Sequence, residues 1–316
     1  MNDIITIGDA MIAFNPSSTG PMKFVPSFNR NIGGAELNVA VGCSRLGLEA
    51  GWISRLGDDE FGKYIRNFAR GEGIDTSQVD FVKDHPTSLN FKEIMEDGSV
   101  RTFYYREKSP TAAMTPDDLS EEYFKQAKVL HITGIFPGVA GNNLDVTKKA
   151  IELAKRLGLT ISFDPNIRLK LWSKEEISRV SKSFLPDVDI LLAGTEEMEI
   201  ILGESDPERI IEACQPYDIG HIILKQGKEG SVGYHNGQFI DSPVVPPRKV
   251  ADTVGAGDGF DAGYIYGYLN NWPLEKSLRF ANTIGSMVVG VVGDNEGLPY
   301  LEDVQMKLGE IERVER

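Results

Sequence analysis

Residues 252–260 read DTVGAGDGF, where a run of small residues leads directly to the carboxylate of Asp258. Apolar residues at helical spacing, from Phe260 to Leu269, predict a helix that begins near Gly257. Small residues at a helix start let an anion approach free backbone N–H groups, where the helix dipole favours negative charge. A carboxylate there can accept the proton of an attacking hydroxyl. The stretch therefore suits phosphoryl transfer to an alcohol, and a glycine-rich turn capped by Asp258 is the structural alternative.

The composition is that of an acidic globular protein with 316 residues, 47 of them acidic and 33 basic, and a net charge of −14. This charge disfavours nucleic acid and anionic membranes as partners. We find no apolar run near the ~20 residues that a membrane-spanning helix needs. Cys43 and Cys214 each lie in an apolar helical pattern, which predicts reduced core thiols and a cytoplasmic location. The four histidines are scattered, which argues against a zinc site.

The elements that must position Asp258 alternate between short apolar runs and segments with helical periodicity. We expect strands at 4–8, 51–54, 128–133, 159–163, 188–193 and 221–225. Helices are predicted at 36–46 and 143–157, each ending at a glycine. This alternation predicts an α/β fold with a mostly parallel sheet covered by helices on both faces.

Two early stretches interrupt this alternation. Residues 12–32 are rich in Pro, Ser and Asn and contain one short strand candidate. Residues 88–106 read as two strands joined at Asp97-Gly98, which is a hairpin signal. We interpret the insertions, at about 12–32 and 88–110, as a small β-sheet lid beside the main sheet. The chain is then a single domain over residues 1–316.

Several motifs resemble those of the ribokinase-like (PfkB) carbohydrate kinases. DTVGAGD resembles the second family signature, and GGAELNVAVGCSRLG at 33–47 resembles the first. GDA at 8–10, LKQGKEG at 224–230 and GDNEGLP at 293–299 follow in the family's order. The resemblance spans nearly the whole chain. It implies a ribokinase-like three-layer sandwich and the ATP- and Mg²⁺-dependent phosphorylation of a sugar.

Three details resemble the 2-keto-3-deoxygluconate kinases of this family: Glu36 in GGAELN, FYYR at 103–106 and DPNIR at 164–168. The implied reaction transfers the γ-phosphate of ATP to the terminal hydroxyl of 2-keto-3-deoxygluconate. A sugar carboxylate needs a cation, and Arg106 and Arg168 can supply one. A neutral-sugar kinase of the fructokinase or ribokinase type and a non-catalytic sugar-acid sensor are the alternatives. A glycosidase would leave the GAGD turn unexplained.

The resemblance also implies roles for individual residues. Asp258 would be the general base, and the N–H groups of Gly255, Ala256 and Gly257 would form the anion hole. The residues implied in sugar binding are Asp9, Gly34, Asn38, Asn90, Tyr104, Arg106, Ile135, Arg168 and Asp294. Asn90 departs from relatives that have a tyrosine there. The residues implied in ATP binding are Asn166, Lys225, Gly227, Gly230 and Asn282.

The family's N-x-x-E motif is incomplete in this chain, because Gly194 replaces its asparagine. Its glutamate, Glu197, would act on Mg²⁺ through water, since Mg²⁺ commonly keeps several waters. A monovalent-cation requirement stays open. Open strand edges in the lid invite pairing, so we expect a homo-oligomer, a dimer or larger, formed through the lid.

Overall fold

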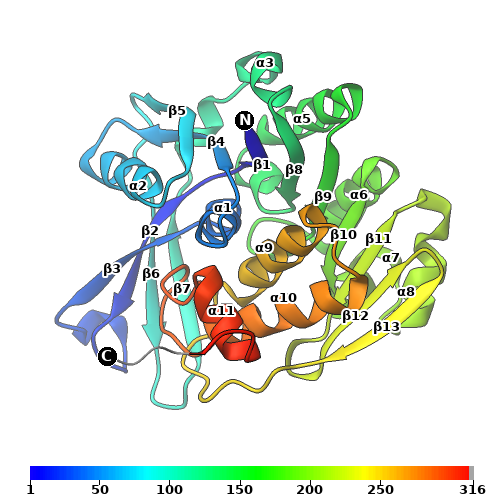
Figure 1. Cartoon of the computed structure of the whole chain (residues 1–316). Coiled ribbons are helices and arrows are strands. Elements are labelled where there is room, and N and C mark those ends of the chain that lie inside the picture. Colours follow the sequence, from blue (N-terminus) through cyan, green and yellow to red (C-terminus); the bar gives the residue numbers. More distant parts are fainter. Residues whose placement is uncertain (313–316) are drawn as a thin grey trace.

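The computed structural model describes residues 1–312, and its largest element is a nine-stranded sheet (Figure 1). Seven neighbouring strands are parallel, and the last two add an antiparallel hairpin at one edge. In spatial order the strands are β13 (Gln238–Pro243), β12 (Gly230–His235), β11 (His221–Lys225), β10 (Ile190–Gly194), β9 (Thr160–Asp164), β8 (Ala127–Thr133), β1 (Asn2–Ile7), β4 (Ala50–Gly57) and β5 (Asp75–Val82).

Both faces of this sheet are buried, as expected for parallel strands covered by helices. Ile4 of β1 packs into one hydrophobic core, whereas its neighbour Ile5 packs into a second core on the opposite face. Leu191 and Leu192 of β10 divide in the same way. The alternation follows from successive side chains of a strand pointing to opposite faces.

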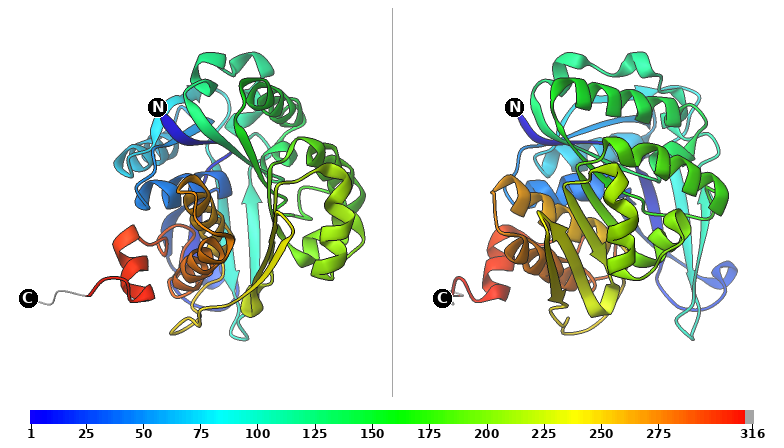
Figure 2. Two further views of the ribbon diagram at one scale, coloured as in Figure 1. Left: turned by 45° about the vertical axis from the view of Figure 1, so that its right-hand side comes forward. Right: turned by 90° about the vertical axis from the view of Figure 1, so that its right-hand side faces the viewer.

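The helices form the two outer layers (Figure 2). Those that contribute to the core containing Ile4 are α1 (Ala35–Arg45), α2 (Glu60–Gly71), α9 (Ala256–Leu269), α10 (Leu274–Val288) and α11 (Leu301–Leu308). Those on the other face are α3 (Glu121–Phe124), α4 (Phe136–Val139), α5 (Asn143–Leu157), α6 (Lys174–Phe184), α7 (Thr195–Leu202) and α8 (Pro207–Cys214). The fold class expected from the sequence is therefore confirmed. None of the helices described is both long and apolar enough to cross a membrane.

A second, four-stranded sheet stands beside the first (Figure 1). Its strands are β3 (Phe28–Gly33), β2 (Met11–Pro16), β6 (Ser88–Ile94) and β7 (Val100–Tyr105), in that order. They come from the two stretches that interrupt the strand–helix alternation, and β6 and β7 form the expected hairpin. We call this element the small sheet. One of its faces carries Asn90, Lys92 and Tyr104, which line a large cavity between the two sheets.

Candidate active site

The cavity has a volume of about 970 Å³ and lies at the carboxyl ends of the parallel strands, where open α/β sheets bind ligands. Most of the residues singled out from the sequence line it: Asp9, Gly34, Asn38, Asn90, Tyr104, Arg106, Ile135, Asn166, Arg168, Glu197, Lys225, Gly255, Gly257, Asp258 and Asp294. Residues more than 280 positions apart in the chain therefore meet around one space.

Asp258 lies in the first turn of α9 and is almost completely buried. Its Oδ2 accepts a hydrogen bond from Asn38 Nδ2 at 2.7 Å, and its Oδ1 accepts one from Asn166 Nδ2 at 3.3 Å. Burial raises the pKa of Asp258 to about 6, and the hydrogen bond from Asn38 opposes this shift. Two amides thus fix a carboxylate whose pKa suits a general base near neutral pH.

The turn before Asp258 requires glycine at its first position. Gly255 has φ 78°, and a Cβ there would lie 2.0 Å from the carbonyl oxygen of Asp294. Gly255 is the N-cap of α9, and no described side chain caps the first turn of this helix. Unpartnered N–H groups at a helix N-terminus bind anions. The N–H of Ala256 donates to the Thr253 carbonyl at 3.4 Å, so the N–H groups of Gly255 and Gly257 are the ones that could meet an anion next to Asp258.

Lys225, at the end of β11, forms the largest buried charge cluster of the site. Its Nζ lies 3.1 Å from Asp164 Oδ2 and 3.1 Å from Asp261 Oδ1. Burial disfavours the ammonium, but Asp164, Asp261 and Glu197 outweigh burial and raise the pKa of Lys225 above its usual range. A Cβ on Gly257 would lie 3.8 Å from this Nζ. Lys225 therefore places a fixed positive charge beneath the turn.

Glu197 also lines the cavity, but both of its carboxylate oxygens are engaged. Oε1 accepts a hydrogen bond from the backbone N–H of Ile167, and Oε2 accepts one from that of Gly194, each at 2.7 Å. Among residues 1–312, no group of three or more His, Cys, Asp or Glu side chains is placed to ligate a metal. Glu197 keeps free lone pairs, so the site fits a Mg²⁺ held mainly by phosphates and waters.

Two arginines enter the cavity without a carboxylate partner among the described residues. Arg106 follows β7 and stacks on Tyr104, its guanidinium carbon 4.9 Å from the ring centroid. Arg168 is exposed on the loop after β9. On the same loop, Lys170 Nζ donates to the Thr102 carbonyl at 2.7 Å and so joins the loop to the edge strand of the small sheet. Two guanidinium groups are therefore available for an anionic ligand.

Three residues that line the cavity each carry a buried acceptor oxygen without a donor. Within residues 1–312, no hydrogen bond reaches Asp9 Oδ1, Asn90 Oδ1 or Glu36 Oε2. Glu36 is fully buried, and its other oxygen accepts from Thr133 Oγ1 at 2.5 Å. Burial raises the pKa of Glu36 to about 7. An unpaired buried acceptor is costly, so the cavity fits a ligand rich in hydroxyl donors.

We divide the site accordingly. The transfer half comprises the turn Gly255–Gly257 with Asp258, Asn38, Asn166, Lys225 and Glu197. The acceptor half comprises Asp9, Asn90, Tyr104, Arg106 and Arg168. Gly34 and Ile135 also line the cavity, and a Cβ on Gly34 would lie 2.6 Å from the carbonyl oxygen of Asp9.

Four of the residues expected at the site do not line the cavity: Ala256, Gly227, Gly230 and Asn282. Asn282 Nδ2 instead donates to Ser231 Oγ at 3.0 Å and to the Ser242 carbonyl at 3.0 Å, which ties α10 to the β12–β13 hairpin. Gly227 has φ 57° and no neighbour beside its Cβ position within 4 Å. The roles of Gly227, Gly230 and Asn282 in ATP binding, and of Ala256 in the anion hole, stay predictions.

Sequence reasoning missed the structural partners of the site. Asp261 is three residues from Asp258 and therefore on a neighbouring helical face, a spacing that could have indicated a second buried carboxylate. Lys92 belongs to no recognised motif. It lies two residues after Asn90 on a predicted strand, however, and side chains at this spacing share one face of the strand. Asp164 was noted only as part of DPNIR.

Comparison with known proteins gives a consistent picture. The model of the pfkB family carbohydrate kinases matches residues 1–301. The 2-dehydro-3-deoxygluconokinase of Bacillus subtilis (strain 168) is 34% identical over 309 residues, which are 95% of this chain and 93% of that protein. The 5-dehydro-2-deoxygluconokinase of Geobacillus thermodenitrificans (strain NG80-2) is 29% identical over 310 residues, 96% of this chain and 92% of that protein.

A solved structure from E. coli, described as a putative Ribokinase II in complex with ATP and Mg²⁺, shares the fold. Its TM-score is 0.91 at 24% identity, over 98% of this chain and 100% of that chain. The family match extends over both signatures and over every strand of the two sheets. The chain therefore belongs to the pfkB family of carbohydrate kinases.

Proposed function

We propose that this kinase transfers the γ-phosphate of ATP to the terminal hydroxyl of a keto-deoxy sugar acid, most specifically 2-keto-3-deoxygluconate (2-dehydro-3-deoxygluconate). One observation carries the choice of an acid. The cavity is lined by two guanidinium groups that form no salt bridge with a carboxylate among residues 1–312, and by the buried carboxylate of Asp258 in the first turn of α9. A neutral sugar would leave Arg106 and Arg168 unpaired.

Asp258 acts as the general base. The acceptor hydroxyl gives its proton to Asp258 while its oxygen forms a bond to the γ-phosphorus. The bond between this phosphorus and the bridging oxygen breaks, and ADP leaves with that electron pair. Asn38 and Asn166 hold the carboxylate in place through the hydrogen bonds that they donate. The N–H groups of Gly255, Ala256 and Gly257 stabilise the charge that develops on the transferred group.

Arg106 and Arg168 bind the carboxylate of the sugar acid through charge-assisted hydrogen bonds. The unpartnered oxygens of Asp9 and Asn90 accept hydrogen bonds from its hydroxyl groups. In this proposal the small sheet is a lid, because Asn90, Tyr104 and Arg106 all come from it or follow it directly. A closed lid excludes water, which otherwise competes as phosphoryl acceptor.

The phosphoryl donor is ATP, and Mg²⁺ neutralises the charge of its phosphate oxygens when bound. Glu197 would act on the ion through water. Lys225 adds a fixed positive charge next to Gly257. A monovalent cation stays a prediction, to be tested by titrating K⁺ and Na⁺ into an assay run in a large-cation buffer.

We infer that the enzyme is a homo-oligomer that associates through the small sheet. The face of this sheet opposite Asn90 and Lys92 carries an aromatic cluster. Phe91 stacks on Phe14 with ring centroids 4.6 Å apart and meets Tyr105 edge-to-face at 5.8 Å, and Tyr105 is 59% exposed. Sedimentation should show a dimer or larger assembly at micromolar concentration, and a monomer would contradict the proposal.

A cytoplasmic location is part of the same proposal, because the enzyme needs ATP and both of its cysteines are free and buried. Fractionation of the source cells tests it. Recovery outside the cytoplasm would contradict it.

The test of function is ADP release with Mg-ATP on a panel of acceptors. It contains 2-keto-3-deoxygluconate, 2-keto-3-deoxygalactonate, 5-dehydro-2-deoxygluconate, gluconate, fructose and ribose. Preference for a keto-deoxy acid supports the proposal. Preference for fructose or ribose would be compatible with Asp258 as the general base, but it would contradict the role of Arg106 and Arg168 in binding a carboxylate. Binding of an acid without turnover on any acceptor would favour the sensor.

A further inference from the structure

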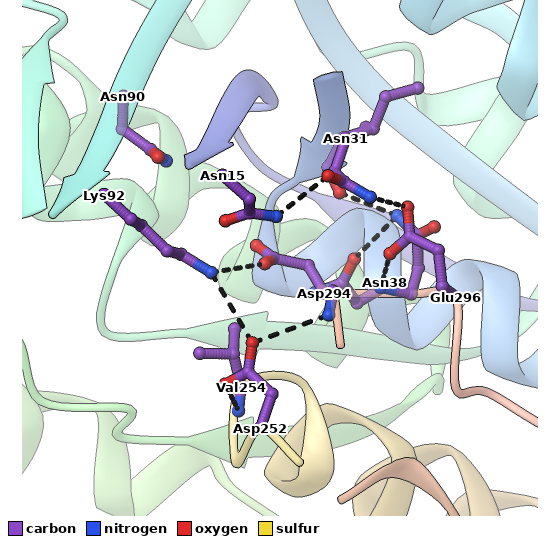
Figure 3. A network of polar contacts seen from close by, with 12 residues as sticks. Asn15, Asn31, Asn38, Asn90, Lys92, Asp252, Val254, Asp294 and Glu296 are labelled. Atoms are coloured by element: carbon purple, nitrogen blue, oxygen red, sulfur yellow. Dashed lines mark hydrogen bonds and ion pairs between the residues drawn. The ribbon is translucent and has the colours of Figure 1, made fainter. Parts of the chain in front are cut away.

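The loop that follows α10 is attached to the small sheet by three consecutive residues (Figure 3). Asp294 Oδ1 accepts from Lys92 Nζ of β6 at 3.2 Å. Asn295 Nδ2 donates to the Ile32 carbonyl of β3 at 2.8 Å. The third residue, Glu296, accepts a hydrogen bond through Oε1 from Asn31 Nδ2 of β3 (Figure 3). This loop is therefore bonded to strands β3 and β6 of the small sheet.

The same loop contacts the catalytic turn. A Cβ on Gly255 would lie only 2.0 Å from the carbonyl oxygen of Asp294, so the two backbones are in close contact. Asp252, three residues before Gly255, accepts hydrogen bonds from the backbone N–H groups of Val254 at 3.1 Å and Gly293 at 3.5 Å. The loop and the turn are thus packed directly against each other.

Lys92 joins both segments to the small sheet. Besides its contact with Asp294, its Nζ lies 3.9 Å from Asp252 Oδ2. The side chain of Lys92 is 10% exposed and that of Asp294 is 11% exposed, so water screens this pair little. Among the described residues, these are the only ion pairs that join the small sheet to another part of the chain. Arg101, the other paired basic residue of the small sheet, pairs with Glu93 within the sheet.

We propose that Lys92 is a positioning residue that couples the position of the small sheet over the acceptor to the placement of the anion-binding turn. Lys92 forms ion pairs with both Asp294 and Asp252 and so keeps the loop packed against Gly255. This packing holds the N-terminus of α9 in the position that binds the phosphoryl group. When the small sheet moves away, the two carboxylates lose their cation and the turn loses this support. The inference rests on the proposed function and adds a device that ties transfer to the presence of an acceptor.

The first test needs no substrate. In Lys92→Met, hydrogen exchange should be faster at residues 251–258 and 291–297 than in the wild-type protein. In the control Arg101→Met, which breaks an ion pair inside the small sheet, exchange at these segments should not change. Unchanged exchange in Lys92→Met would overturn the proposal. Lys92→Gln is measured in parallel in case the methionine variant does not fold.

The second test separates positioning from substrate binding. At saturating Mg-ATP, Lys92→Met should lower kcat by about 10- to 100-fold, because a small misplacement of the turn slows transfer. The KM of the sugar acid should change by less than about threefold. A raised KM with kcat preserved would mean that Lys92 binds the acceptor, and an unchanged kcat would remove the coupling. Both results overturn the proposal.

A double-mutant cycle tests whether Lys92 acts through Asp294. The double variant Lys92→Met/Asp294→Asn should lose clearly less kcat than the product of the two single losses, since both changes disrupt the same contact. A loss equal to the product of the two single losses would show independent action and contradict the proposal. A wild-type enzyme inactive on every acceptor would refute the proposed function, whereas the exchange experiment would still test the coupling.

Discussion

The two halves of the cavity differ in how completely they are built. In the transfer half, Asp258 is bonded to two amides, Lys225 lies between two carboxylates, and both oxygens of Glu197 are engaged by backbone N–H groups. In the acceptor half, Arg106 and Arg168 line the cavity and form no salt bridge with a carboxylate among the described residues. The difference indicates that the chemistry is preorganised, whereas the contacts that select the sugar are completed by the ligand.

The largest effect should come from the centre of the transfer half. Asp258→Asn keeps the size of the side chain but removes the base, and its amide nitrogen can no longer accept the hydrogen bond that one carboxylate oxygen accepts from Asn38 or Asn166, so kcat should fall by about 10³-fold. The affinities for ATP and for the sugar acid should change little, which calorimetry can measure. Asp145→Asn, in the first turn of α5, is the matched control and should keep full activity. A comparable kcat in Asp258→Asn would refute the role of base.

Removing the buried cation of the transfer half should lower the stability of the protein as well as the rate of phosphoryl transfer. Lys225→Met leaves Asp164 and Asp261 facing each other without a counter-ion, and breaking a buried pair in this way costs about 3–5 kcal/mol. The free energy of unfolding from a urea titration measures this loss. Lys228→Met, whose side chain is 92% exposed, should change stability little. An unchanged stability in Lys225→Met would show that the cluster is not structural.

The acceptor half should respond in affinity and selectivity. Arg106→Gln or Arg168→Gln should lower kcat/KM for the sugar acid by roughly 10- to 100-fold, because each removes a charged hydrogen bond worth about 1.5–3 kcal/mol. Thermal unfolding should be nearly unchanged. Arg101→Gln is the control, because Arg101 is exposed on β7, the strand that precedes Arg106. An equal loss on a neutral sugar would place the arginines outside carboxylate recognition.

The pH dependence of activity tests the role of Asp258 without changing any residue of the wild-type enzyme. Burial raises the pKa of Asp258 from 3.8 to about 6, and the base must be ionised to act. Activity should therefore fall about tenfold per pH unit below pH 6, whereas an ordinary aspartate would keep activity to about pH 4. Burial also raises the pKa of Glu36 to about 7, so protonation of Glu36 could produce a similar loss of activity at low pH. Glu36→Gln is therefore the control. An acid limb that disappears in Glu36→Gln would belong to Glu36 instead.

Local patterns predicted the main elements of the fold closely. The apolar stripe that stops before Gly158 predicted a helix at 143–157, and α5 has these bounds. The strand expected at 51–54 extends over Ala50–Gly57, because apolar periodicity does not mark where pairing with a neighbouring strand ends. The strand expected from residue 188 begins at Ile190, since Val188 belongs to the turn before it.

Most of the residues expected at the site line one cavity, but the contacts between them were not predicted from the sequence. The GAGD motif indicated Asp258 and its turn, because helix-start chemistry is local. The pairing of Lys225 with Asp261 and of Lys92 with Asp294 joins residues 36 and 202 positions apart. Such contacts depend on how sheets and helices pack, which a single sequence does not encode locally.

The most direct test of the central claim compares two acceptors that differ at one group. 2-Keto-3-deoxygluconate and 3-deoxyfructose share a chain of hydroxyls, but the second carries a neutral hydroxymethyl group in place of the carboxylate. We predict that the wild-type kcat/KM is at least about 100-fold higher for the acid, and that Arg106→Gln/Arg168→Gln removes most of this ratio. Equal kcat/KM values for the two acceptors in the wild-type enzyme would contradict the account.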